Sequence, residues 1–399
     1  MRILHLSHVG PIKQPTGGII HVMESMKNEI AHGHDSHWIS IRTDREIGLK
    51  TSSHHLRIGK KSHNERNGFG DWNLSQEIAN SEKARQFLKR EVEKFQPDLL
   101  VFEGPWLWPI YMRASNEFPF LRKIQHVYSA HNVEHILIPK IYESRGMPIE
   151  NLTISRNLLK NMEAELISSS LACISLSSDD AEALKENKAK HIIKASNGIT
   201  VQKSNRISTW KVSRCFQPQN VIALFVSSNW DPHVLGLREL INSKQVNELT
   251  ARKIQVVIVG SIADSFSDFP ESSMSNLRVI PETIVFLGRI KSTDFGALLD
   301  RANVFVLPIS FGGGKGIKTS EALSSSKLVL GTKSAFRGFA ISKKEQGVIT
   351  VNSSPEILDC LIEAVDKKVV YNQFKRDSSE HSWSIALKPW LDWLDSRFL

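Results

Sequence analysis

Cysteine is scarce in this chain, and no cysteine pair has the spacing of a metal or redox motif. Among 399 residues only Cys173, Cys215 and Cys360 occur, and none belongs to a C-x-x-C pair. An odd number of widely spaced cysteines argues against a disulfide framework and against a zinc site, and it fits a reducing compartment. We expect all three to be small buried residues.

Long apolar runs are also missing. No stretch approaches the roughly 18 apolar residues that a membrane-spanning helix needs. The apolar start at residues 1–6 is too short for the core of a signal peptide and lacks a small-residue cleavage site. We therefore expect a cytoplasmic protein, with the inner face of the membrane as an open alternative.

Clusters of lysine and arginine are absent although the chain is basic, with a formal net charge of +9. A basic surface attracts nucleic acid, anionic lipids and phosphorylated small molecules. No basic run long enough to track phosphates and no RNP-like, zinc-finger or helix-turn-helix signature occurs, so nucleic acid is not an expected partner. The polar stretch 50–66 is interpreted as a solvated loop, and a surface for an anionic membrane or an acceptor is the main alternative.

The pattern of apolar residues predicts a parallel α/β protein. Short β-branched runs alternate with longer stretches whose apolar residues have helical spacing. A first set of strands is predicted at 3–7, 38–41, 98–102, 124–129, 171–175 and 191–195. Helices are predicted from Gly17 to just before Gly33, and at 75–95, 151–169 and 178–186.

The same pattern restarts in the second half of the chain. Strands are predicted there at 220–226, 254–259, 283–287, 303–307, 327–330 and 348–351. The segment between the two sets is polar, contains Pro218 and has no clear periodicity. We therefore predict four parts: a first domain over 1–200, a linker over 201–219, a second domain over 220–380, and a terminal helix over 381–399 docked across the domains.

The most informative stretch is a glycine-rich segment after the predicted strand at 303–307. It contains four glycines and a lysine, namely Gly312, Gly313, Gly314, Lys315 and Gly316. Glycines let a backbone approach a ligand closely, and the amides of a helix start favour an anion such as a diphosphate. Lys318 adds a full positive charge, and the carboxylate of Glu321 suits the hydroxyls of a ribose. The ordinary alternative is a flexible loop before an amphipathic helix. A Walker loop is excluded, because the Gly-Lys pair lacks a serine or threonine at the required spacing.

The order of several motifs resembles GT-B glycosyltransferases. Residues 283–289, 298–308 and 316–323 are similar to the donor-site half of the large retaining family that includes glycogen synthase-like, mannosyl- and lipopolysaccharide-type transferases. Motifs of the first half follow in the family's order: Arg2-Ile3-Leu4, Gly17-Gly18, Gly33-His34, His131-Asn132 and Asn197-Gly198-Ile199. The resemblance implies the GT-B fold, in which two Rossmann-like, doubly wound parallel-sheet domains face each other across a cleft. It places the acceptor side in the first domain and the nucleotide-sugar donor in the second.

One departure separates this chain from many members of that family. They carry two glutamates separated by seven residues, and the first would fall at Gly313 while the second is Glu321. The chain resembles instead the branch with Gly-Gly-Gly-x-x-x-Lys in this place, which ends here at Lys318. The contact of the first glutamate with the donor sugar is therefore not provided. The family's Pro-Asn dipeptide near Trp230 is also replaced, by Asp231-Pro232-His233.

The resemblance implies catalytic roles for His131 and Lys318. His131 would lie beneath the donor sugar, although a polar residue at a strand end is the ordinary alternative. Lys318 would stabilise the negative charge that develops on the leaving diphosphate. Glu321 would hold the ribose, and the backbone near Arg289 would meet the base. The remaining donor-binding residues implied are Gly17, Gly18, Gly312, Gly313, Gly314, Lys315, Gly316 and Ile317.

The sequence thus predicts a retaining glycosyltransferase that moves a sugar from a nucleotide-diphosphate sugar to a glycan or lipid-linked acceptor. Surface polysaccharide assembly is the expected setting, with contact at an anionic membrane as an open possibility. No Asp-x-Asp triad stands out, so neither a metal nor another cofactor is expected. Two alternatives stay open: a catalytically silent GT-B interaction module, and a nucleotide-sugar 2-epimerase on the same fold.

Overall fold

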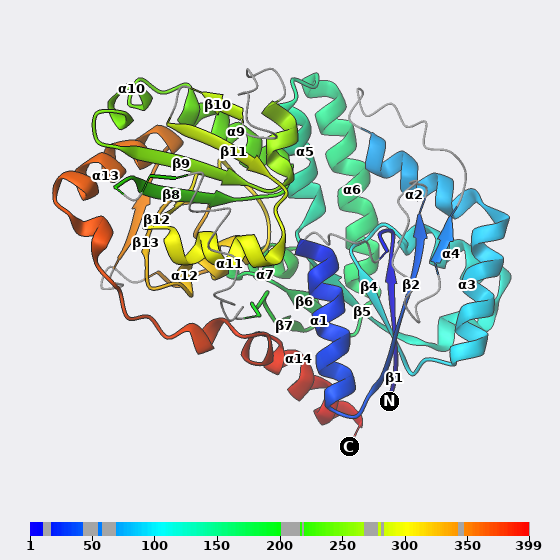
Figure 1. Ribbon diagram of the computed structural model, residues 1–399. Helices are drawn as coiled ribbons and strands as arrows, with labels where there is room; N and C mark the ends of the chain where they lie inside the picture. The colour runs from blue at the N-terminus through cyan, green and yellow to red at the C-terminus, as the bar shows by residue number, and fades with distance from the viewer. Residues whose placement is uncertain are drawn as a thin grey trace. The chain divides into compact units, whose positions relative to one another are not determined.

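The computed structural model divides the chain into two compact units (Figure 1). It describes residues 1–10, 17–42, 55–57, 69–200, 216–217, 219–266, 278–280, 283–341 and 347–398. The first unit comprises Met1–Asn197 together with Trp383–Leu399, and the second comprises Gly198–Ser382. The predicted linker at 201–219 lies almost wholly outside the described residues, as does the polar stretch 50–66 apart from 55–57.

The first unit is built on a seven-stranded parallel sheet with the order β3-β2-β1-β4-β5-β6-β7. Its strands are β1 Arg2–Ser7, β2 Asp35–Arg42, β3 His55–Arg57, β4 Leu99–Glu103, β5 Gln125–Ala130, β6 Cys173–Ser175 and β7 Ile192–Lys194. All five residues of β4 are buried, as expected for a central strand covered on both faces.

The helices of the first unit connect these parallel strands. They are α1 Gly17–Ala31, α2 Gly70–Asn80, α3 Glu82–Phe95, α4 Trp108–Glu117, the 3-10 helix η2 Pro119–Lys123, α5 Glu134–Ser144, α6 Ile149–Ser169 and α7 Ser178–Glu186. The helical segment predicted around 75–95 is confirmed and consists of two helices, α2 and α3. Ser81 separates them, and its hydroxyl caps α3 by accepting a hydrogen bond from the Ala84 amide.

The last helix returns to the first unit. α14 spans Trp383–Phe398 and belongs to that unit, where it contacts α1 and β7. Figure 1 shows α14 in red beside α1 in blue. The large side chains Trp390, Leu391 and Leu394 are buried. The apolar stripe predicted near the end of the chain therefore packs on the first unit.

The second unit repeats the same architecture. Its sheet has the order β10-β11-β9-β8-β12-β13-β14, in which only β10 is antiparallel to its neighbour. The strands are β8 Val221–Val226, β9 Ile254–Val259, β10 Arg278–Ile280, β11 Ile284–Gly288, β12 Val304–Leu307, β13 Leu328–Thr332 and β14 Val348–Val351. Its helices are α9 Asp231–Ile241, α10 Val246–Leu249, η4 Ser261–Phe266, α11 Ser292–Arg301, α12 Ile317–Leu323, α13 Ser354–Asp366, η5 Val369–Tyr371 and η6 Ser378–His381.

Both sheets reverse their strand order at one point. The reversal lies between β1 and β4 in the first unit and between β8 and β12 in the second. Doubly wound sheets bind ligands at such switch points, outside the carboxyl ends of the strands. The predicted α/β class with two doubly wound sheets is confirmed, and the loops after these four strands become the places to search for a site.

Two further sequence predictions can be compared with the described residues. Cys173 is buried and Cys360 is half-buried, whereas Cys215 lies outside the described part of the chain. Within the described ranges, no helix combines the length and the apolar character that a membrane crossing requires.

Candidate functional site

The first group of predicted site residues lies at the start of α1 and after β5. Gly17 and Gly18 open α1, and His131 directly follows β5. A Cβ atom on Gly18 would lie only 2.9 Å from Nδ1 of His131. Because real Cβ atoms do not approach other atoms this closely, glycine is required for the helix start to lie against the imidazole. The structure thus brings Gly18 and His131 together.

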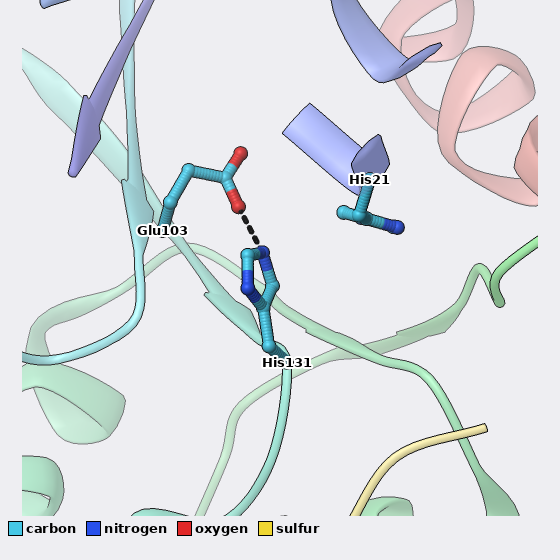
Figure 2. A group of neighbouring side chains, drawn as sticks. All are labelled: His21, Glu103 and His131. Atoms are coloured by element: carbon cyan, nitrogen blue, oxygen red, sulfur yellow. Dashed lines mark hydrogen bonds and ion pairs between the residues drawn. The ribbon is translucent and has the colours of Figure 1, made fainter. Parts of the chain in front are cut away.

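His131 is held by a buried glutamate that the sequence analysis missed. Its Nε2–H donates to Oε2 of Glu103 at 2.6 Å (Figure 2). Glu103 is the last residue of β4 and therefore lies at the switch point of the first sheet. A glutamate directly after the strand predicted at 98–102, at the carboxyl end where ligands of such sheets bind, is the signal that could have found it.

Glu103 is itself the middle of a longer hydrogen-bonded chain. Its Oε1 accepts from Nδ1 of His5 at 2.6 Å, and Nε2 of His5 donates to Oε2 of Glu29 at 2.9 Å. The carboxylate of Glu29 also accepts from Ser36 Oγ at 2.6 Å and from Trp390 Nε1 at 2.7 Å. The chain therefore connects α14 to His131 through the core of the first unit.

The charges of Glu29, His5 and Glu103 alternate in sign along the hydrogen-bonded chain. Burial alone would lower the pKa of His5, but the Glu29 and Glu103 carboxylates outweigh it and raise that pKa to about 10. Burial alone would raise the pKa of Glu103, but hydrogen bonds from His131 and His5 hold it well below its usual range. Burial alone would also raise the pKa of Glu29, but the charge of His5 outweighs it and lowers that pKa. At neutral pH His5 is therefore an imidazolium between two carboxylates.

Two further histidines lie close to His131 and are neutral. Burial, followed by the neighbouring His131 imidazole, lowers the pKa of His21 to about 4 and that of His8 to about 3. The ring centroids of His21 and His131 are 5.1 Å apart, and Nδ1 of His21 is 3.0 Å from Oδ1 of Asn197. Figure 2 shows His21 beside the Glu103–His131 pair.

His21, Glu103 and His131 are also the trio of described residues that could hold a metal ion. Their ligand atoms lie within 4.8 Å of one another. Imidazole nitrogen and carboxylate oxygen suit zinc and similar cations. Both oxygens of Glu103 already accept hydrogen bonds, from His131 and from His5, so a metal would share this carboxylate with two histidines. The predicted independence of metals stays a prediction.

The second group of predicted site residues surrounds the loop between β12 and α12. Gly312 to Gly316 form this loop, which leaves the switch point of the second sheet. A Cβ atom on Gly312 would lie 3.1 Å from Nη1 of Arg337 and 3.4 Å from the ring of Trp230. Nε of Arg337 donates to the carbonyl of Gly314 at 3.1 Å, and its Nη2 donates to that of Gly313.

Arg337 therefore shapes the glycine-rich loop, although the sequence analysis did not predict it. It lies shortly after β13, the strand next to β12. Adjacent parallel strands end at the same edge of a sheet, so polar residues after β13 were candidates on position alone. A guanidinium with five donors in a fixed fork can hold two carbonyls at once.

Positive charge gathers at this loop. Nζ of Lys318 donates to Oε2 of Glu321 at 2.9 Å, and about a third of each side chain is exposed. Nζ of Lys315 lies 4.8 Å from the ring centroid of Phe339, and burial lowers the pKa of Lys315. Burial, then Arg337 and Lys318, lower the pKa of His233 to about 4. The loop can thus attract an anion, and Lys318 and Glu321 are within reach of one ligand.

Arg289 lies apart from this loop, at the end of β11, where its guanidinium pairs with Asp264 at 3.0 Å. Two strands, β9 and β8, separate β11 from β12. The ends of β11 and β12 are therefore about 14 Å apart, at ~4.8 Å per strand spacing. Ile317, by contrast, is the first residue of α12 and adjoins the loop. The predicted residues thus fall into two groups, one in each unit, with Arg289 some distance along the second sheet.

Comparison with known proteins supports the fold and the family. Residues 221–367 match the family described as Glycosyl transferases group 1. Sucrose-phosphate synthase from Thermosynechococcus elongatus is 13% identical with a TM-score of 0.68, and 99% of each chain is covered. HepE from Anabaena in complex with UDP is 14% identical with a TM-score of 0.62, over 99% of this chain and 100% of that chain.

A third similar structure is WaaG, a glycosyltransferase involved in lipopolysaccharide biosynthesis. It is 13% identical with a TM-score of 0.61, over 99% of this chain and 96% of that chain. No curated protein sequence matches this chain. The predicted GT-B fold is confirmed for the whole chain, and the predicted resemblance to group 1 glycosyltransferases is confirmed by the match over 221–367.

Proposed function

We infer that this chain, whose residues 221–367 match the family described as Glycosyl transferases group 1, moves a sugar from a nucleotide-diphosphate sugar to an acceptor with retention. The observation that carries the proposal is the place of the Gly312–Gly316 loop. It leaves the switch point of the second sheet and carries Lys318 and Glu321 directly behind it. HepE, which has the same fold, binds UDP.

The roles proposed for the residues that bind the nucleotide-sugar donor follow from the chemistry of the leaving group. Breaking the bond between the sugar and the phosphate puts negative charge on the diphosphate, and fixed positive groups stabilise that charge most where water is limited. Lys318, Lys315 and the amides of the glycine-rich loop supply these groups. Glu321 accepts hydrogen bonds from the ribose, and the backbone beside Arg289 meets the base. Binding draws Lys318 and Glu321 from each other toward the ligand.

Retention is proposed to proceed by attack on the same face as the leaving group. The acceptor oxygen bonds to the anomeric carbon as the bond to phosphate breaks, and the hydroxyl proton passes to the departing phosphate. A covalent intermediate would need a carboxylate nucleophile near the sugar. Glu103 is the carboxylate beside His131, and both its oxygens are engaged by histidines in the buried core. That arrangement favours a reaction without such an intermediate.

We propose that no metal takes part, because the carboxylate of the only described trio of ligands is already held by two histidines. Chelation with EDTA should leave turnover unchanged. A loss of activity that added zinc or magnesium restores would contradict this part of the proposal.

The acceptor is proposed to be a glycan or lipid-linked glycan of surface polysaccharide assembly. The fold is shared with WaaG, which acts in lipopolysaccharide biosynthesis, and the net charge of +9 suits an anionic acceptor or membrane. The cytoplasmic location and the contact with an anionic membrane stay predictions. Sedimentation with anionic and neutral lipid vesicles tests that contact.

The proposed function is tested on the donor side. Thermal-shift screening against nucleoside diphosphates and nucleotide-sugars should identify a stabilising ligand, and that donor should be consumed when a glycan acceptor is present. Lys318→Ala should lower turnover roughly 100- to 1,000-fold, as loss of one charge-stabilising group does elsewhere. Lys367→Ala, which removes an exposed lysine just after α13, serves as the matched control.

The same assay separates the alternatives. A 2-epimerase would convert the donor without any acceptor. A silent interaction module would bind no nucleotide and turn over no donor. Unchanged turnover in Lys318→Ala would also overturn the assignment of the site.

A further inference from the structure

The hydrogen-bonded chain behind His131 is buried along its whole length except at one end. The side chains of His5, Glu29 and Glu103 are at most 1% exposed, whereas that of His131 is 16% exposed. Placing two carboxylates and an imidazolium inside a sheet costs more than well-packed apolar side chains would, so stability alone is a weak reason for it. The only member that reaches the surface is the candidate catalytic histidine.

The donors and acceptors in this chain fix where the protons lie. An ionised carboxylate only accepts hydrogen bonds, so Glu103 requires a proton on Nε2 of His131 and one on Nδ1 of His5. Glu29 in turn requires a proton on Nε2 of His5, and its own orientation is set by Ser36 and Trp390. With Nε2 of His131 carrying its proton inward, Nδ1 is the nitrogen that faces the start of α1 at Gly18.

We propose that Glu103 and His5 are positioning residues, which hold the ring of His131 and keep its proton on Nε2 so that Nδ1 is presented to the ligand. Glu29 and Trp390 complete the support from α1 and α14. That Nδ1 of His131 meets a ligand rests on the proposed function. That the proton of His131 lies on Nε2 does not rest on it. Among the described residues, the other titratable groups beside His131 are His8 and His21, both neutral at physiological pH.

The proposal is tested by reading the protonated nitrogen of His131 directly. In protein labelled with ¹⁵N-histidine, long-range ¹H–¹⁵N correlation spectra distinguish the Nε2–H form from the Nδ1–H form, and His131→Asn assigns the signal. We expect Nε2–H in the wild type. Glu103→Gln should lose this preference, because the glutamine amide can donate to Nε2 and drive the proton to Nδ1. Glu103→Asp keeps the charge and should keep Nε2–H.

Steady-state kinetics measure how a displaced proton on His131 affects catalysis. Glu103→Gln should lower kcat by about a hundredfold, the loss that follows a misplaced catalytic group, and should alter the dependence of kcat on pH. Glu103→Asp should recover part of kcat and the original pH profile. Glu91→Gln removes another buried carboxylate of the first unit, one paired with Arg90, and should change neither readout.

Each failure has its own meaning. If the protein shows no transferase activity, the proposed function fails while the NMR result still decides the position of the proton. If Glu103→Gln does not fold, Glu103→Ala is measured instead; it removes the acceptor of the Nε2–H bond and should also lose the Nε2–H preference. Nε2–H retained in Glu103→Gln, with an unchanged pH profile, would overturn the proposal. So would one equivalent of zinc in the purified protein that is lost in both Glu103→Gln and His21→Ala, because the trio would then be a metal site.

Discussion

Gly18 and His131 are separated by more than one hundred residues in sequence, yet a single methyl group would not fit between them. A Cβ on Gly18 would lie 2.9 Å from Nδ1 and 3.5 Å from Cε1 of the imidazole. The first turn of α1 is therefore in contact with the histidine, and the absence of a side chain there determines where the ring can lie. This contact places two residues of the predicted donor site in one constellation.

Gly18→Ala should impair catalysis more than folding. The new methyl group must push the His131 ring by a few tenths of an ångström or more, or move the start of α1, so we expect kcat to fall about tenfold to a hundredfold. The midpoint of thermal unfolding should change little, because alanine has a better helix propensity than glycine.

A double-mutant cycle with His131→Ala checks this assignment. If Gly18→Ala acts through the imidazole, it should have no further effect on kcat in the His131→Ala background. Additive losses in the double variant would show that Gly18 acts independently of His131.

Much of the fold could be predicted because its central elements carry their signals locally. The strands predicted at 254–259 and 348–351 and the helix predicted at 178–186 coincide with β9, β14 and α7 residue for residue. β9 is apolar apart from Gln255, and its other five residues are buried, as expected for a parallel strand covered on both faces. Ser177 caps α7 by accepting from the Asp180 amide, a cap that the sequence displays directly.

The helix α5 shows why other elements escaped prediction. It contains Pro139, which argues against a helix interior. Its start is stabilised from a distance: the Glu163 carboxylate on α6 accepts hydrogen bonds from the backbone amides of Glu134 and His135 at 3.0 and 2.8 Å. A cap supplied from 28 residues away leaves no local pattern in the sequence.

The site was predictable in its glycines and lysines but not in its supports. Gly18, His131 and Lys318 belong to motifs with a recognisable order. His5 lies in a strand that was interpreted only as apolar, and its pairing with Glu103 depends on the register between β1 and β4. Arg337 contacts the glycine-rich loop only because β13 pairs with β12. Contacts of this kind follow from strand pairing, which spacing along the chain does not fix.

Arg337→Lys should weaken nucleotide binding without unfolding the second unit. A lysine cannot hold the carbonyls of Gly313 and Gly314 together, because it lacks the fork of the guanidinium. We expect the Kd for the best nucleoside diphosphate of the thermal-shift screen to rise about tenfold in isothermal titration calorimetry, which corresponds to about 1.4 kcal/mol. Arg252→Lys, which alters an exposed ion pair with Asp366, is the control. Equal affinities in both variants would mean that Arg337 does not shape the binding loop.

Glu134→Gln should make the protein more stable at neutral pH. Burial, and then the charge of Glu163, raise the pKa of Glu134 well above its usual range. Between the unfolded and folded pKa values the folded state binds more protons, so the free energy of unfolding falls as pH rises above about 4.5. Glutamine needs no proton to be neutral and should remove this fall. Urea unfolding of both proteins between pH 4 and 7 measures this dependence. Plots of the free energy of unfolding against pH that stay parallel for the two proteins would contradict the raised pKa of Glu134.

His5→Gln should change the response of stability to alkaline pH. The folded-state pKa of His5 is about 10 against 6.5 unfolded, so the folded state holds an extra proton across that window. The free energy of unfolding should therefore fall as pH rises from about 6.5 to 10, by up to about 1.4 kcal/mol per pH unit for this one proton. In His5→Gln that fall should be absent, although the variant should be less stable at pH 7 by about 3–5 kcal/mol, because Glu29 and Glu103 lose the charge between them. Urea unfolding at pH 7, 8 and 9 measures both effects. An alkaline slope that is the same in wild type and His5→Gln would mean that His5 is not charged in the folded protein, and the alternation of charge from Glu29 through His5 to Glu103 would not hold.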